Sequence, residues 1–187
     1  MAVPALLRMI ATMPTTIVTS DLDAIVGEID VSAPPERVFE ALTDSSQLMR
    51  WFGSESCPAK FWRMDARKGG TYGYATKKGD FAVNGVDAFE CHGEILEFDP
   101  PRLLVYTWIG NWHLDKEKPT IVRWELTPTA AGTRVKMTHR GLASEAASRD
   151  DYRGGWPGVL NSLKQFVENH LEDAHGDRNG YARSECN

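Results

Sequence analysis

The chain of 187 residues has few cysteines, and they stand far apart. Cys57, Cys91 and Cys186 are the only three, and no two of them form a CxxC pair. Three scattered thiols cannot build a disulfide framework, and the usual ligand spacing of a structural zinc site is missing. Because an odd number of cysteines suits a reducing compartment, we expect a cytoplasmic protein.

The sequence also lacks a cluster of basic residues and a long apolar segment. It has 26 acidic and 21 basic side chains, a net charge of −5. Binding to a phosphate backbone or to an anionic membrane needs a concentrated positive face. The apolar start lies between Pro4 and Pro14, lacks a basic region and is too short to span a bilayer. We therefore expect no nucleic-acid partner, no membrane insertion and no signal peptide.

The rest of the composition is that of one globular domain, with 42% hydrophobic residues. Apolar periodicity begins near residue 24 and ends near Leu171, and the segments outside it are polar or loosely patterned. We therefore expect a flexible N-terminal arm over residues 1–22, a domain over residues 23–172 and a polar tail over residues 173–187. The start of translation stays open between Met1 and Met13.

Strand-like alternation dominates the middle of the chain. Between residues 120 and 127, Val122, Trp124 and Leu126 share one face, and Val135 and Met137 do the same in the next segment. Such alternation is typical of an antiparallel sheet with one buried face. The pattern predicts strands over residues 24–31, 60–65, 71–76, 88–98, 103–109, 120–127 and 133–141.

Helical spacing occurs after the first strand and again at the end. Residues 32–36 predict the opening of a first short helix that closes at 43–44, and a second short helix follows from 45–46 to about Phe52. Apolar residues at steps of three and four from Trp156 to Leu171 predict a long helix. Because the apolar face of the sheet must be covered, we expect this last helix to cover it. The predicted class is α+β: a curved antiparallel sheet of about six or seven strands around a long C-terminal helix.

Several residues that could carry function lie on the predicted inner faces. Tyrosine and tryptophan side chains there indicate either a cavity that stacks a flat ligand or a plainly packed core. His139 indicates either a polar anchor for a ligand or a hydrogen-bonded core histidine. Glu90, His92 and Glu94 share one strand face, which we expect to face solvent.

Metal ligation and cofactor binding have little support in the sequence. Cys91, His92, His113 and His139 show no chelating spacing, and the Gly69-Gly70 pair is followed by no phosphate-binding motif. We therefore expect neither a metal nor a cofactor.

Four segments resemble a known superfamily: residues 31–52 (VSAPPERVFEALTDSSQLMRWF), 93–108, 124–142 and 155–168. They are similar to the SRPBCC, or START-like, superfamily, and within it to the branch named after activators of the heat-shock chaperone ATPase. The resemblance implies a helix-grip fold over residues 23–172, with a cavity for lipids, polyketides or flavonoid-like aromatics. It does not imply a single activity.

Three functions follow from the residues and the resemblance together. The first is binding of a small hydrophobic ligand without chemistry; the second is a cyclase-like or hydrolase-like enzyme that uses His139, Glu90 or His92; the third is a cochaperone-like contact. We choose the first, and the sequence leaves a homodimer open. The predicted ligand-binding residues are Trp51, Tyr72, Tyr74, Tyr106, Trp108, Trp124, Met137, His139, Trp156, Leu160 and Leu163.

Overall fold

The computed structural model describes residues 14–53 and 57–176, the last seven of these by backbone alone. In this part of the chain the elements are β1 (Thr15–Val18), β2 (Ala24–Val31), α1 (Pro35–Thr43), α2 (Ser45–Trp51), β3 (Ala59–Met64), β4 (Thr71–Thr76), β5 (Glu90–Asp99), β6 (Leu103–Gly110), β7 (Thr120–Thr129), β8 (Gly132–Arg140) and α3 (Ala146–Gly176). The predicted arm up to residue 13, the choice of start and the tail from residue 177 lie outside the described residues.

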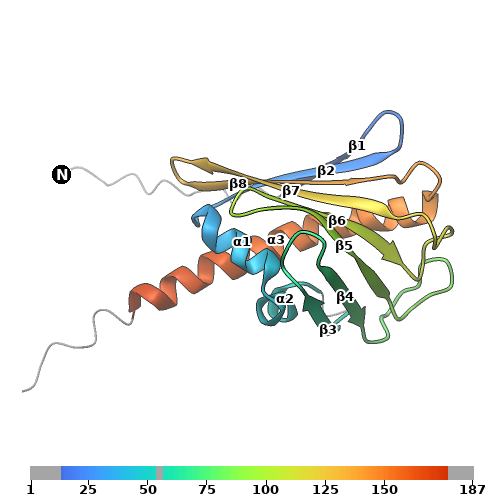
Figure 1. Ribbon diagram of the computed structural model, residues 1–187, viewed down its shortest axis with the longest axis horizontal. Helices are drawn as coiled ribbons and strands as arrows, with labels where there is room; N and C mark the ends of the chain where they lie inside the picture. Colours follow the sequence, from blue (N-terminus) through green and yellow to red (C-terminus); the bar gives the residue numbers. More distant parts are fainter. Residues whose placement is uncertain (1–13, 54–56, 177–187) are drawn as a thin grey trace, which may run out of the picture.

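One antiparallel sheet contains all the strands, in the order β1-β2-β8-β7-β6-β5-β4-β3 (Figure 1). Strands β3 to β8 form the predicted meander, and β8 then pairs with β2. The α+β class, the two short helices after the strand Ala24–Val31 and the long C-terminal helix are therefore confirmed. The sheet has eight strands instead of the six or seven predicted. The additional strand is β1, which lies within the range predicted as an arm and pairs with β2.

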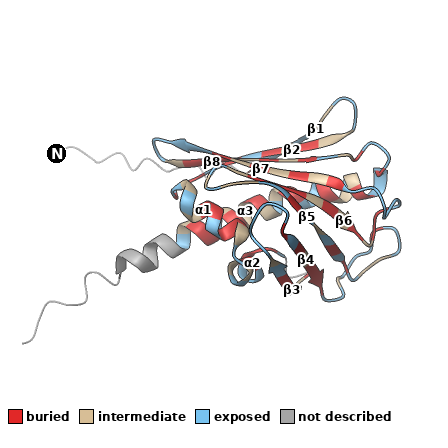
Figure 2. Ribbon diagram, in the orientation of Figure 1, coloured by how far each residue is buried: buried red, intermediate tan, exposed pale blue. Residues whose placement is uncertain are grey.

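The inner face of the sheet forms the floor of the core. Val122, Trp124 and Leu126 of β7 are all buried, as predicted from their alternation, while Arg123 and Glu125 between them are only half-buried. In the neighbouring strand β8, buried positions likewise alternate with half-buried or exposed ones (Figure 2). Because successive side chains of a strand point to opposite faces, every second residue is available to contact α3.

The two short helices meet at a single capping residue. The backbone N–H of Asp44 closes α1 by donating to the carbonyl of Glu40, and its carboxylate accepts a hydrogen bond from the backbone N–H of Gln47 at the start of α2. At the end of α2, the indole N–H of Trp51 donates to the carbonyl of Ala41 at 2.9 Å. This buried bond fixes the end of α2 against α1.

Helix α3 packs closely on the half of the sheet that contains β2. A Cβ atom on Gly27 would lie 2.7 Å from Cδ1 of Leu160, so glycine is what lets the helix come this near. Pro157 lies inside α3 and removes one helical hydrogen bond; the hydroxyl of Thr16 in β1 lies 3.4 Å from the carbonyl of Arg153 that is released. Among the described residues no helix is long and apolar enough to cross a membrane.

The contact between Leu160 and β2 should carry much of the stability of this fold. Leu160 is fully buried, so the change Leu160→Ala leaves a cavity at the closest helix–sheet contact. We expect it to lower the free energy of unfolding by about 2–4 kcal/mol, measured by urea denaturation. The exposed Arg153→Ala on the same helix is the control and should change it by no more than about 0.5 kcal/mol. Equal effects in the two variants would contradict this packing.

Candidate functional site

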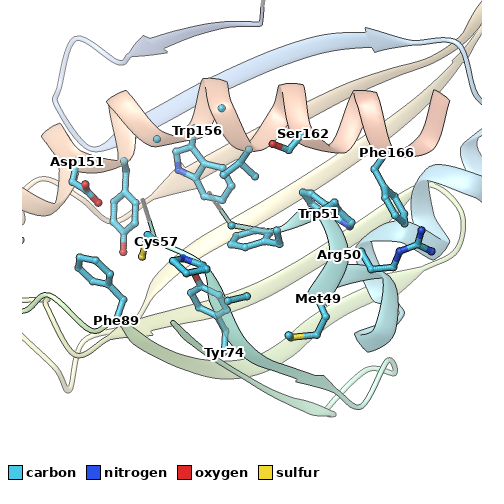
Figure 3. Close-up of a pocket in the computed structure, with 18 of the residues that line it drawn as sticks. Met49, Arg50, Trp51, Cys57, Tyr74, Phe89, Asp151, Trp156, Ser162 and Phe166 are labelled. Atoms are coloured by element: carbon cyan, nitrogen blue, oxygen red, sulfur yellow. The ribbon is translucent and has the colours of Figure 1, made fainter. Parts of the chain in front are cut away.

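A pocket of about 920 Å³ runs along one side of α3. Its opposite wall is formed by the end of α2, the residues that lead into β3, and the inner faces of β4 and β6 (Figure 3). The pocket thus lies beside the close contact between α3 and β2, on the side where the helix meets the other half of the sheet.

The wall formed by α3 is a row of residues at helical spacing. Tyr152, Gly155, Val159, Ser162 and Phe166 follow one another at steps of three and four, so they share one face of the helix. A Cβ atom built on Gly155 would have no neighbouring atom within 4 Å, and the same holds for Gly158, which also lines the pocket. The helix backbone is therefore open to the pocket at these two positions.

The opposite wall is mainly aromatic. Phe52 packs edge-on against Tyr74, with ring centroids 5.4 Å apart, and tilts against Trp108 at 6.4 Å. Phe89 packs edge-on against Trp112 at 5.1 Å, and Trp108 lies 6.5 Å from Trp112. These edge-to-face contacts hold the rings in fixed orientations, so the pocket offers flat apolar surfaces to whatever enters it.

One hydroxyl of the pocket is held by two buried rings. Tyr152 accepts a hydrogen bond from the indole N–H of Trp108 at 2.8 Å, and its oxygen lies 2.7 Å from Nε2 of His113. Burial raises the pKa of Tyr152 well above its usual value and lowers the pKa of His113, so both are uncharged at neutral pH.

The two ends of the pocket carry opposite charges. Asp151 and Phe89 lie at one end, and Arg50 and Phe166 lie at the other (Figure 3). The guanidinium of Arg50 lies 5.2 Å from the ring centroid of Phe166. Burial raises the pKa of the Asp151 carboxyl, because few groups around it replace the water that would solvate its charge.

Of the predicted ligand-binding residues, the structure brings Trp51, Tyr74, Trp108 and Trp156 together at the pocket. The other seven are buried in the core and do not line it: Tyr72, Tyr106, Trp124, Met137, His139, Leu160 and Leu163. Their neighbours are other core groups; for example, the indole N–H of Trp124 donates to the hydroxyl of Tyr106 at 2.9 Å.

His139 has both ring nitrogens occupied. The hydroxyl of Thr120 donates its hydrogen to the carbonyl of Trp108. The hydroxyl oxygen of Thr120 therefore accepts a hydrogen bond from Nε2–H of His139, at 2.8 Å. The indole N–H of Trp156 donates to Nδ1 of His139 at 3.3 Å. Burial lowers the pKa of His139 to about 3 and keeps the ring neutral. These bonds match the core histidine, one of the two interpretations that the sequence left open.

The residues required by the enzymatic hypothesis do not meet at the pocket. Glu90, His92 and Glu94 are exposed, as expected for the outer face of β5, and neither they nor His139 line the pocket. Within the part of the chain that the structure describes, no group of three or more His, Cys, Asp or Glu side chains is placed to hold a metal ion.

The pocket residues that sequence reasoning missed come mostly from α3 and from connections between strands. Asp151, Tyr152, Gly155, Gly158 and Ser162 are small or polar, and a search for apolar spacing passes over them. The row at steps of three and four beside the apolar stripe was the signal that could have found them. Phe81 and Trp112 lie outside the helices and strands and follow no periodicity that could have placed them. Phe89 falls within the strand predicted over residues 88–98, but β5 begins one residue later, at Glu90.

A sheet that wraps a long C-terminal helix, with a pocket between helix and sheet, defines a helix-grip protein of the SRPBCC superfamily. A family model confirms the branch by matching residues 32–168. The chain belongs to the family described as Activator of Hsp90 ATPase homolog 1-like protein.

Solved structures agree with this assignment. A protein from Chromobacterium violaceum is 27% identical, with a TM-score of 0.67, over 78% of this chain and 98% of its own. The AHSA1-like protein from Aeromonas hydrophila is 20% identical, with a TM-score of 0.60, over 87% and 99%. A protein from Arthrobacter aurescens is 17% identical, with a TM-score of 0.70, over 84% and 93%. The last two support the fold alone. No curated protein matches the chain.

The low pKa of His139 predicts how stability depends on pH. Below the unfolded-state pKa of about 6.5, the unfolded chain gains a proton that the native state binds only near pH 3. Stability is therefore complete above about pH 6.5 and falls as the pH is lowered, by about 1 kcal/mol per pH unit from this residue.

Urea denaturation between pH 7 and pH 4.5 measures this slope. His139→Gln keeps a donor toward Thr120 but cannot titrate, so it should reduce the slope to the part that His113 contributes, although it lowers stability overall. The exposed His92→Gln is the matched control and should leave the slope as in the wild type. A slope as steep in His139→Gln as in the wild type would contradict the assignment.

Proposed function

We propose that the protein binds a small hydrophobic molecule in the pocket between α3 and the aromatic wall. The observation that carries the proposal is the open helix backbone at Gly155 and Gly158, which faces fixed aromatic rings across the pocket. Elsewhere α3 packs against the sheet without such space, as at Leu160. A volume of about 920 Å³ is within the range of small-molecule sites.

The surfaces of the pocket favour a molecule with a flat, apolar body. Phe52, Tyr74 and Trp108 present rings on one side, and the two glycines let a ligand approach the helix on the other. Tyr152 adds a neutral ring to this wall, with its hydroxyl bonded to Trp108 and His113. Polyketides, flavonoid-like aromatics and lipids with a ring system meet these requirements, and membership of the superfamily supports the same classes. Binding of this kind requires no bond to be made or broken.

A chaperone-related contact is the second candidate, because the family description names an activator of a chaperone ATPase. The outer sheet face carries polar pairs: Arg134 lies 2.9 Å from Asp30, and Arg123 lies 3.3 Å from Glu97. Exposed ion pairs of this kind are ordinary surface features and single out no partner. A pull-down with the purified chaperone that recovers no complex would remove this candidate. A cytoplasmic location and a homodimer stay predictions.

Filling the pocket from the helix side tests the proposal. Gly158→Leu places a side chain in open space within the pocket, and leucine favours a helix by about 0.8 kcal/mol over glycine, so the variant should fold. We expect the uncharged dye Nile red to bind the wild type saturably, measured by fluorescence titration. Its affinity for Gly158→Leu should fall by about tenfold or more, a loss of about 1.4 kcal/mol.

The neighbouring glycine gives a matched control. Gly154 lies on the same helix and does not line the pocket, and a Cβ atom built on it would also have no neighbouring atom within 4 Å. Gly154→Leu should therefore bind Nile red as the wild type does. Absence of saturable binding to the wild type, or equal losses in the two leucine variants, would contradict binding in this pocket.

A further inference from the structure

One end of the pocket combines a carboxylate with a group of aromatic rings. Asp151 lines the pocket one residue before Tyr152, whose ring lies 6.1 Å from Trp112. Trp112 in turn packs edge-on against Phe89, and Phe89 lies 5.4 Å from Phe81. All five residues line the same pocket, so a molecule at this end meets a carboxylate and several ring surfaces together.

The carboxylate of Asp151 has no partner among the described residues: no hydrogen bond or ion pair joins it to residues 14–53 or 57–169. The nearest cationic side chains along α3 point elsewhere. Arg149 donates to the carbonyls of Leu22 and Leu142, and Arg153 is exposed and does not line the pocket. A charge held partly out of water without a counter-ion is unfavourable for the folded protein.

The other groups near this end do not neutralise Asp151 either. His113 is buried, bonded to the hydroxyl of Tyr152 and uncharged at neutral pH. Arg50 lies at the opposite end, beside Phe166. Along the helix axis Asp151 and Phe166 are separated by about 22 Å, at 1.5 Å per residue. The Asp151 end of the pocket is therefore negative, and the positive end is far from it.

A carboxylate beside aromatic rings is an environment that attracts organic cations. Ring faces carry negative electrostatic potential, and a cation placed over them gains energy, more so where water is excluded. A ligand cation would also supply the missing counter-charge of Asp151, whereas a ligand anion would be repelled. A neutral ligand would leave the carboxylate as it is.

We infer that the ligand of this pocket is a hydrophobic molecule that carries a protonated or quaternary amine, with the cationic nitrogen held by Asp151 and the neighbouring rings. This inference rests on the proposed function and names the chemical class of its ligand. The flat apolar body lies along Gly155 and Gly158, and the cationic group lies at the end of the pocket that contains Phe89 (Figure 3).

Three probes with one ring system test the inference: 2-naphthylmethylamine, 2-naphthylmethanol and 2-naphthoate, which are cationic, neutral and anionic at pH 7. Their dissociation constants can be measured by NMR titration, following the indole N–H signals of the pocket tryptophans. We expect the wild type to bind the amine about three- to tenfold more tightly than the alcohol, and the carboxylate most weakly.

In Asp151→Asn the affinity for the amine should fall to that for the alcohol, while the affinity for the alcohol stays unchanged. Because the substitution removes a partly buried charge, the variant should fold, and its thermal unfolding checks this. Asp150→Asn is the matched control: Asp150 is exposed, does not line the pocket and should keep the preference for the amine.

The outcomes separate the inference from the proposed function. If the wild type binds the amine and the alcohol equally, the cationic class is wrong while hydrophobic binding stands. If Asp151→Asn keeps the full preference for the amine, the assignment of the cationic nitrogen to Asp151 is wrong. If the wild type binds none of the three probes, the inference falls together with the proposed function.

Discussion

The structure depends on one asymmetric contact: α3 lies flush on one half of the sheet and apart from the other. At Gly27 the helix and β2 approach so closely that a Cβ atom would meet Leu160 at 2.7 Å. On the side of β4 and β6, Gly155 and Gly158 leave open space along the same helix. Hydrophobic burial on the first side holds the helix in place, and so the second side can stay unfilled.

The polar groups of the interior divide according to the same asymmetry. In the packed part, His139 is saturated by Thr120 and Trp156, which is how buried polar groups are normally accommodated. In the pocket, Asp151 keeps a charge that no described residue balances. Groups left incompletely satisfied at a site are typical of binding surfaces, because a ligand completes them.

Much of the fold could be predicted from the sequence, because periodicity reports which face of an element is buried. The alternation around Val122 and Val135 fixed the strands, and the apolar stripe from Trp156 fixed the side of α3 that meets the sheet. The four-residue strand β1 was missed because it is too short to show a period. The pocket could be predicted only in part. Periodicity places Tyr106 and Trp108 on the same inner face of β6, but it does not tell that Trp108 lines the pocket while Tyr106 is buried in the core.

The central claim is that a bound molecule lies against the open backbone of α3. Intermolecular nuclear Overhauser effects between bound Nile red and the isotope-labelled protein measure this contact directly. The account predicts contacts from the dye to the α protons of Gly155 and Gly158 and to the ring of Trp108, all of which line the pocket. Contacts confined to outer-face residues such as Glu94, with none to the two glycines, would contradict it.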